Sequence, residues 1–161
     1  MQRLAGDRAI ADTTLNIPHP YPNGAAERWI ATSEALYAHG EEARFAVTTP
    51  DGTLVGAAGL RIAPEHRHGE LGYWVGRPYW GRGYATEAAH LVVHYGFEQR
   101  GLHRIIARHL TRNPASGRIM RKLGMQREGC DREHVIKWGK FEDLDRYGLL
   151  RAEYVRPSWL E

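Results

Sequence analysis

A pair of glycines near the middle of the chain has the spacing of a turn that binds an anion. Gly81 and Gly83 flank Arg82, and the residues that follow have helical periodicity. Glycine lets the backbone pass close to a ligand, and the first N–H groups of a helix have no partner inside it. The helix dipole and the Arg82 side chain add positive potential there. The sequence therefore predicts that a pyrophosphate binds at this turn.

Two common nucleotide-binding motifs do not fit this turn. A P-loop needs Lys followed by Ser or Thr after its last glycine, whereas Tyr84 and Ala85 follow Gly83. A dinucleotide fingerprint needs a third glycine, and position 86 is Thr86. Since Gly-x-Gly turns also join strands to helices for steric reasons, a purely structural role stays open. The motif predicts a phosphate-binding turn of another type.

A strand, two helices and a buried strand are expected to position this turn. Residues 70–75 alternate as a strand that ends at Gly76, and a helix with an apolar face opens after the turn and stops at Gly101. Residues 102–110 are expected to form a buried strand. A short helix over 114–123 should follow, because Asn113 is a good N-cap, Pro114 suits the first position and Gly124 supplies the stop.

The rest of the chain alternates between loop, helix and strand patterns. Residues 16–24 are proline-dense and predict an ordered loop, and 26–37 repeat at helical spacing. The Asp51–Gly52 pair predicts a β-hairpin between two short β-rich runs. The expected strands outside the central motif are residues 45–49, 54–60, 125–130, 135–138 and 144–149, with a turn at 138–140. This order predicts a mixed α/β fold with antiparallel and crossover connections.

The composition is that of one soluble globular domain over residues 1–161. Apolar residues make up 42% and charged residues 25%, and no window approaches a membrane span, so we expect a cytoplasmic protein without a membrane partner. The net charge of +3 is spread along the chain, which argues against a nucleic-acid partner. Cys130 is the one cysteine, which excludes an intramolecular disulfide and a four-ligand cysteine metal site, and we expect it to be a packed small side chain.

Three separated motifs resemble the GNAT superfamily of acetyltransferases. The window from Trp80 to Ala85 is similar to its phosphate-binding turn, with Trp80 in the place of the usual Gln or Arg. That form, the string from Tyr79 to Ala88, and the stretches 102–125 and 138–150 resemble the Rim-type (RimJ/RimL-like) ribosomal-protein N-terminal acetyltransferases. The resemblance begins at about Ala11.

The resemblance implies a single-domain α/β fold: a central, mixed and mostly antiparallel sheet with a splayed central strand pair and helices on both faces. The first strand of the family is not matched, and Met1 falls inside its first helix. We expect either a truncated start or a sheet without that edge strand.

The same resemblance implies an enzyme that takes its acetyl group directly from acetyl-CoA, with no metal. A substrate amine attacks the thioester, and CoA leaves as a thiolate. Glu70 matches a position where some members carry a catalytic Glu and is our candidate base, with His66 and His68 as alternatives. The backbone N–H of Val75 is expected to stabilise the oxyanion. Met120 stands where many members have a Tyr that acts as the acid, so this function must move or be dispensed with, and Ser116 is our candidate to hydrogen-bond the departing thiolate.

The remaining predictions concern binding. The expected acetyl-CoA-binding residues are Trp74, Val75, Gly81, Arg82, Gly83, Tyr84, Ala85, Thr86, Asn113 and Ser116. For Asn113 an N-cap role alone stays open, as does a capping hydroxyl for Ser116 and a solvated carboxylate for Glu70. Further basic side chains that either meet CoA phosphates or form a solvated face are Arg118, Arg121 and Lys122. Tyrosines assigned to packing are Tyr73, Tyr95 and Tyr147.

The acceptor is the least defined part of the prediction. We expect a primary amine, first a protein N-terminus and second a small molecule such as an aminoglycoside or a polyamine. Loop 16–24 and the segment around Trp138 should select it, and the loop has no acidic cluster of the kind that polycations demand. A CoA-binding module without catalysis is the alternative from another class. A homodimer is possible.

Overall fold

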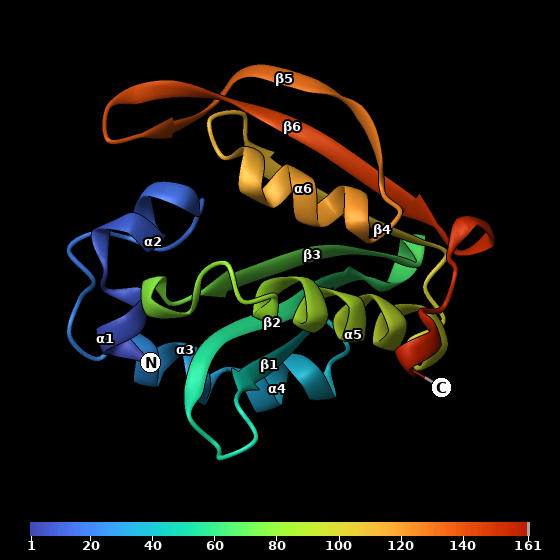
Figure 1. Ribbon diagram of the computed structural model, residues 1–161, viewed down its shortest axis with the longest axis horizontal. Coiled ribbons are helices and arrows are strands. Elements are labelled where there is room, and N and C mark those ends of the chain that lie inside the picture. The colour runs from blue at the N-terminus through green and yellow to red at the C-terminus, as the bar shows by residue number, and fades with distance from the viewer. Residues whose placement is uncertain (161) are drawn as a thin grey trace.

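A computed structural model describes residues 1–160 as helices packed around one six-stranded sheet (Figure 1). The strand order is β1-β2-β3-β4-β6-β5. The strands are β1 (Glu42–Thr48), β2 (Leu54–Ala63), β3 (His68–Val75), β4 (Arg104–Leu110), β5 (Gln126–Lys137) and β6 (Lys140–Leu150). The helices are α1 (Gln2–Ala5), α2 (Arg8–Thr13), α3 (Ala25–Ala31), α4 (Ser33–Ala38), α5 (Tyr84–Glu98) and α6 (Pro114–Lys122). This is the mixed α/β architecture that the sequence predicted.

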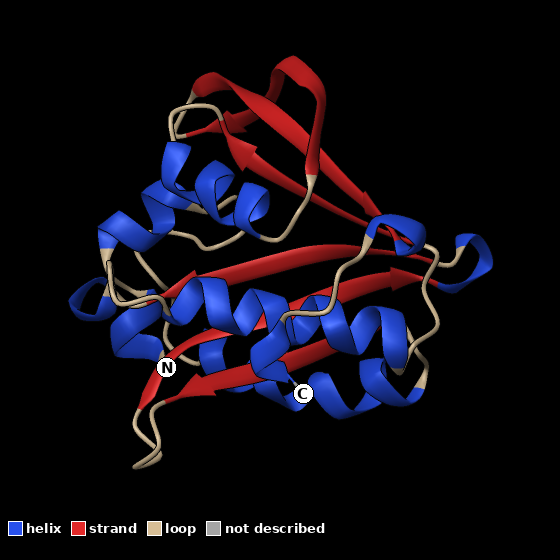
Figure 2. Ribbon diagram, turned by 45° about the vertical axis from the view of Figure 1, so that its right-hand side comes forward, coloured by secondary structure: helices blue, strands red, loops and turns tan. Residues whose placement is uncertain are grey.

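Helices cover both faces of the sheet, as Figure 2 shows. One face carries Leu60 and Leu71, which pack with α5 in the main core. Gly96 of α5 lies so close to this face that an added Cβ would come within 2.8 Å of Leu60, so the helix backbone sits directly on the sheet. On the other face Arg44 of β1 donates to the backbone carbonyl of Trp29 in α3. The N-terminal helices are therefore held to the opposite side from α5.

The centre of the sheet opens into a fork. Strands β3 and β4 are its one parallel pair within residues 1–160, and their register runs only from His68 opposite Arg104 to Glu70 opposite Ile106. Beyond Glu70, β3 continues to pair with β2 alone as far as Val75, and β4 continues to pair with β6 alone. The two strands thus diverge in the direction of the glycine turn. This confirms the splayed central pair.

Three local predictions need correction. The helix expected over 26–37 is two helices, which meet at Thr32. The two strands expected over 125–138 are one long strand, β5, whose register with β6 shifts twice, between Arg127 and Gly129 and between Asp131 and Val135. Cys130 lies exposed on this strand rather than packed, because β5 is the edge of the sheet and no helix covers Cys130 there. Among residues 1–160, no helix is long and apolar enough to cross a bilayer.

Candidate active site

Two cavities meet where the sheet forks. The larger, of about 500 Å³, lies over β2 and β3 beneath the N-terminal segment, and we call it the acceptor-side cavity. The smaller, of about 390 Å³, lies between the start of α5 and α6, and we call it the donor-side cavity. Residues that line both are Thr13, Thr14, Tyr73, Trp74 and Ser116. A group bound in one cavity can therefore meet a group bound in the other at these residues.

The donor-side cavity is formed around the glycine turn. Gly81 and Gly83 have φ of 75° and 89°, a conformation that glycine adopts without strain. A Cβ added at either position would meet no atom within 4 Å, so both glycines face open space. All the expected cofactor-binding residues line this cavity except Arg82, whose guanidinium lies 5.9 Å from the Tyr79 ring. Arg82 is exposed beside the turn.

The first turn of α5 presents backbone donors to this space. The N–H groups of Thr86 and Glu87 both donate to the carbonyl of Gly83, and no side chain caps the helix. The N–H groups of Tyr84 and Ala85 have no acceptor within the helix, as is general for a first turn. Together with the dipole of this 15-residue helix, they fit a phosphate group. The residues present therefore suit the pyrophosphate of CoA.

The free edge of β3 supplies donors closer to the fork. The N–H of Gly76 donates to the carbonyl of Val55 in the direction of β2. Since alternate residues of an antiparallel strand donate to opposite sides, the N–H groups of Tyr73 and Val75 are directed toward the opened gap. Trp80 fixes this end of the strand, because its indole N–H donates to the Val75 carbonyl at 2.6 Å. Backbone donors with this orientation could stabilise an oxyanion.

Tyr73 and Ser116 form a hydrogen-bonded pair at the junction of the cavities. The Tyr73 hydroxyl lies 2.8 Å from Ser116 Oγ and 3.2 Å from the Ser116 carbonyl oxygen. Burial raises the pKa of Tyr73 to about 12. At neutral pH the hydroxyl keeps its proton and can donate a hydrogen bond, so Tyr73 has a polar contact in addition to the predicted packing against the core. The alternation of side chains along a strand could have indicated this contact, because it places Tyr73 on the face of β3 opposite to Glu70.

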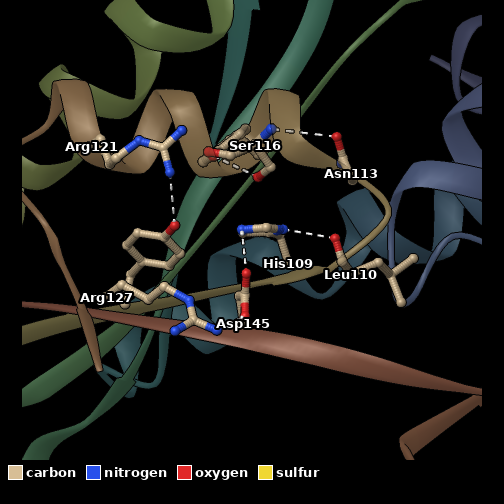
Figure 3. Close-up of polar contacts among 9 residues, drawn as sticks. His109, Leu110, Asn113, Ser116, Arg121, Arg127 and Asp145 are labelled. Carbon is tan, nitrogen blue, oxygen red and sulfur yellow. Dashed lines mark hydrogen bonds and ion pairs between the residues drawn. The ribbon is translucent and has the colours of Figure 1, made fainter. Parts of the chain in front are cut away.

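Hydrogen bonds from two other elements hold Thr13 and Thr14, which lie at the junction of the two cavities. Asn113 caps α6 by accepting from the Ser116 N–H at 3.4 Å, and its Nδ2 also donates to the Thr13 carbonyl at 3.1 Å. Lys137 Nζ donates to the Thr14 carbonyl, and burial lowers the pKa of this amine. Asn113 is thus both an N-cap and a link to the N-terminal segment. Figure 3 shows Asn113 and Ser116 side by side at the start of α6.

The acceptor-side cavity is lined by paired charges. Glu70 Oε1 accepts two hydrogen bonds from Arg108, at 2.8 and 3.0 Å. Arg44 binds Glu42 at 2.6 Å and lies over the Trp29 ring at 4.6 Å. Gly72 forms part of the floor, where an added Cβ would meet nothing within 4 Å. The predicted base therefore lies in the cavity wall, with one carboxylate oxygen held by an arginine.

Other predicted residues divide between the site and the surface. Arg118 and Lys122 line the donor-side cavity, whereas Arg121 donates to the Tyr147 hydroxyl. His66 and His68 line neither cavity. Met120 is buried and lines the acceptor-side cavity. It occupies the position at which many family members have a Tyr that acts as the acid.

One buried histidine was not singled out from the sequence. The His109 ring lies under α6, where Nδ1 donates to the Leu110 carbonyl and Nε2 is 3.9 Å from Asp145 (Figure 3). The His109 side chain lines the acceptor-side cavity, and its ring lies so close to the backbone of Gly117 that a Cβ added there would meet it. No cluster of three metal-ligating side chains occurs in the described part of the chain.

Comparison with known proteins assigns the family. Residues 1–126 match the family of the acetyltransferase (GNAT) domain. The chain belongs to this family. It is 36% identical to the uncharacterized N-acetyltransferase YoaA of Bacillus subtilis (strain 168) over 124 residues, which are 76% of this chain and 70% of that protein. The family match and this relative show that the GNAT chain is an acetyl-CoA-dependent N-acetyltransferase.

Two further comparisons concern substrates. The [ribosomal protein uS5]-alanine N-acetyltransferase of Escherichia coli (strain K12) is 27% identical over 78% of this chain and 66% of its own length. Spermidine N-acetyltransferase from Vibrio cholerae, solved in complex with CoA and spermine, has the same fold, with a TM-score of 0.81 over 95% of this chain and 89% of that one. Its identity to the GNAT chain is 23%. The relative from Escherichia coli and the structural neighbour from Vibrio cholerae thus act on different amines.

Proposed function

We propose that this enzyme acetylates the α-amine of a protein N-terminus, with acetyl-CoA in the donor-side cavity and the amine in the acceptor-side cavity. The observation that carries the proposal is the meeting of the two cavities at Tyr73, Trp74 and Ser116. A thioester that enters from one side and an amine that enters from the other come together there. Proximity and orientation of two substrates are themselves large contributions to catalysis.

Backbone groups supply most of the donor side. The glycine turn and the first N–H groups of α5 would hold the pyrophosphate, and the gap between β3 and β4 would admit the pantetheine arm. The N–H of Val75 would stabilise the negative oxygen that forms during attack. Because these donors are fixed by strand and helix geometry, they need no reorganisation when charge develops.

Glu70 is the proposed base and acts through water. Tyr73 is three residues farther along β3, a separation of roughly 10 Å at about 3.3 Å per residue. A proton from an amine at the junction must therefore reach Glu70 by a chain of ordered waters in the cavity. The two hydrogen bonds from Arg108 hold Oε1, and Oε2 is left to receive the proton.

Ser116, held by Tyr73, is the proposed hydrogen-bond donor to the departing thiolate, which then takes its proton from solvent. The Tyr73 and Ser116 hydroxyls share a hydrogen bond in which either can be the donor, and when Tyr73 donates, the Ser116 hydroxyl is free to donate a hydrogen bond to the departing thiolate. A pKa of about 12, caused by burial, keeps Tyr73 protonated over the whole neutral range. This pair can hydrogen-bond the leaving group, which Met120 cannot do. It also argues for an enzyme rather than a CoA-binding module, since a hydroxyl chain at the cavity junction has no need to exist in a module that only binds.

A protein N-terminus is favoured over a polyamine by two observations. The uS5-alanine acetyltransferase of Escherichia coli, whose acceptor is a protein α-amine, is a relative over 78% of the chain. The acceptor-side cavity also lacks the excess of carboxylates that a polycation requires, because Glu42 and Glu70 are each bound by an arginine. An α-amine has the further advantage of a lower pKa than an alkylamine, so more of it is the neutral nucleophile.

The test is a direct assay with acetyl-CoA and a panel of N-terminal peptides, spermidine and an aminoglycoside. Acetylated products are identified by mass spectrometry, and fragmentation locates the acetyl group. We expect acetylation of peptide α-amines, with polyamines at least tenfold poorer in kcat/KM. Acetylation of spermidine in preference to every peptide would assign the enzyme to small amines. Acetyl-CoA binding without turnover on any amine would leave only a binding function.

A further inference from the structure

A row of charged residues crosses the acceptor-side face of the sheet. Glu42 of β1 is opposite Arg61 of β2, and Arg61 is opposite Glu70 of β3. Directly opposite residues project from the same face, and neighbouring strands are about 4.8 Å apart. Arg61 therefore lies between two carboxylates, and all three residues line the acceptor-side cavity.

Both of these carboxylates are taken by other arginines. Glu42 pairs with Arg44 and Glu70 pairs with Arg108, whereas Arg61 has no ion pair or side-chain hydrogen bond within residues 1–160. The cavity wall thus holds three guanidinium groups against two carboxylates. One positive charge is left over, at the exposed Arg61 beside Glu70. An unpaired cation in a substrate cavity is a site for an anionic group of the substrate.

The position of Arg61 fixes how far that anion lies from the reacting amine. Arg61 is opposite Glu70, and Trp74 at the cavity junction is four residues farther along β3, or roughly 13 Å at about 3.3 Å per residue. An Arg61 side chain that extends toward the junction would shorten this separation to roughly 10 Å. An extended peptide advances about 3.3–3.6 Å per residue. The spacing therefore matches a side chain about three residues after the acetylated one, or two residues after it where the acidic side chain itself extends toward Arg61.

We propose that Arg61 selects acceptor peptides that carry Asp or Glu at position 3 or 4, counted from the amine. This rests on the proposed function and adds its sequence preference. Arg44 cannot serve instead, because Trp29, Thr32 and Glu42 already occupy its guanidinium. A polyamine would place a second cation beside Arg61 and be repelled.

The experiment uses matched peptides with an amidated C-terminus, which differ only by Asp or Asn at position 2, 3, 4 or 6. Steady-state kcat/KM and calorimetric affinity in the presence of CoA are measured for the wild type, Arg61→Gln, Arg61→Glu and the control Arg132→Gln. Arg132 is an exposed arginine of β5 outside both cavities. For the wild type we expect a three- to tenfold preference for Asp at position 3 or 4 and none at position 6, weaker at high salt.

Arg61→Gln should abolish this preference, so that matched Asp and Asn peptides have equal kcat/KM and equal affinity. Arg61→Glu should reverse it, so that the Asn peptides are preferred to the Asp peptides. Arg132→Gln should behave as the wild type. Equal affinity of Asp and Asn peptides for the wild type, or a preference that persists in Arg61→Gln, would overturn the assignment of Arg61. Because affinity is measured apart from turnover, a failure of catalysis on all peptides would count against the proposed function and not against Arg61.

Discussion

The two cavities are built in different ways. The donor-side cavity depends on backbone: two glycines with positive φ, the first N–H groups of α5 and the free edge of β3. The acceptor-side cavity depends on side chains that come from β1, β2, β3, β4 and the N-terminal segment. A substrate that is always the same can be bound by backbone geometry. A substrate that differs between relatives needs side chains, which can change one at a time without disturbing the turn.

The largest effect is expected at the acceptor side. Glu70→Gln keeps the shape and one acceptor oxygen for Arg108 but removes the basic oxygen. Since a general base contributes roughly 10²–10⁴-fold, turnover at neutral pH should fall by that order, with partial rescue at high pH. Acetyl-CoA affinity should not change. Unchanged turnover from pH 6 to 9 would remove Glu70 from the mechanism, and Glu65→Gln, at an exposed carboxylate outside both cavities, is the control.

The second effect tests whether backbone geometry holds the donor. Gly83→Val introduces a β-branched residue at a φ of 89°, which strains the turn and moves its N–H groups. We expect acetyl-CoA affinity to fall at least tenfold, or about 1.4 kcal/mol, by calorimetry. Gly52→Val is the matched control, because Gly52 has a φ of 83° in the remote β1–β2 turn. Equal losses in the two variants would show that global strain, not the donor site, is responsible.

The third effect concerns the pair at the junction. Tyr73→Phe and Ser116→Ala each remove one hydroxyl, and we expect turnover to fall by about three- to tenfold, the value of one hydrogen bond. The double variant should cost little more than either single one, because the two hydroxyls act as one chain. Since the pKa of Tyr73 is about 12, the ratio of wild-type to Tyr73→Phe turnover should be constant from pH 6 to 9. Independent, multiplicative losses would disprove the chain, and Tyr95→Phe, outside both cavities, is the control.

The smallest effect is expected for Arg82. It was predicted to bind the pyrophosphate, yet its side chain lies beside Tyr79 and does not line the donor-side cavity. Arg82→Ala should weaken acetyl-CoA binding by no more than about threefold, and only at low salt, as for an exposed charge. A loss of tenfold or more in calorimetry at physiological salt would show that Arg82 turns inward when CoA binds. The backbone would then share the donor site with a side chain.

The sequence by itself predicted most of the elements and the glycine turn that lines the donor-side cavity. Gly81, Gly83 and the helix after them are neighbours in the chain, so their joint effect on backbone geometry can be read without a fold. The N-cap at Asn113 is equally local, and the structure confirms that Asn113 caps α6. The resemblance added the splayed strands, which the register of β3 and β4 confirms.

Only the tertiary structure decided which side chains meet. Tyr73 and Ser116 are 43 residues apart in the chain, and Glu70 and Arg108 are 38 apart. Their contacts depend on how far β3 and β4 diverge and on where α6 rests, and neither is encoded in a local pattern. The same holds for Cys130, whose exposure follows from the place of β5 at the sheet edge. Pairing across strands is a property of the whole sheet. The contacts that form the acceptor-side cavity could therefore be identified only from the assembled sheet.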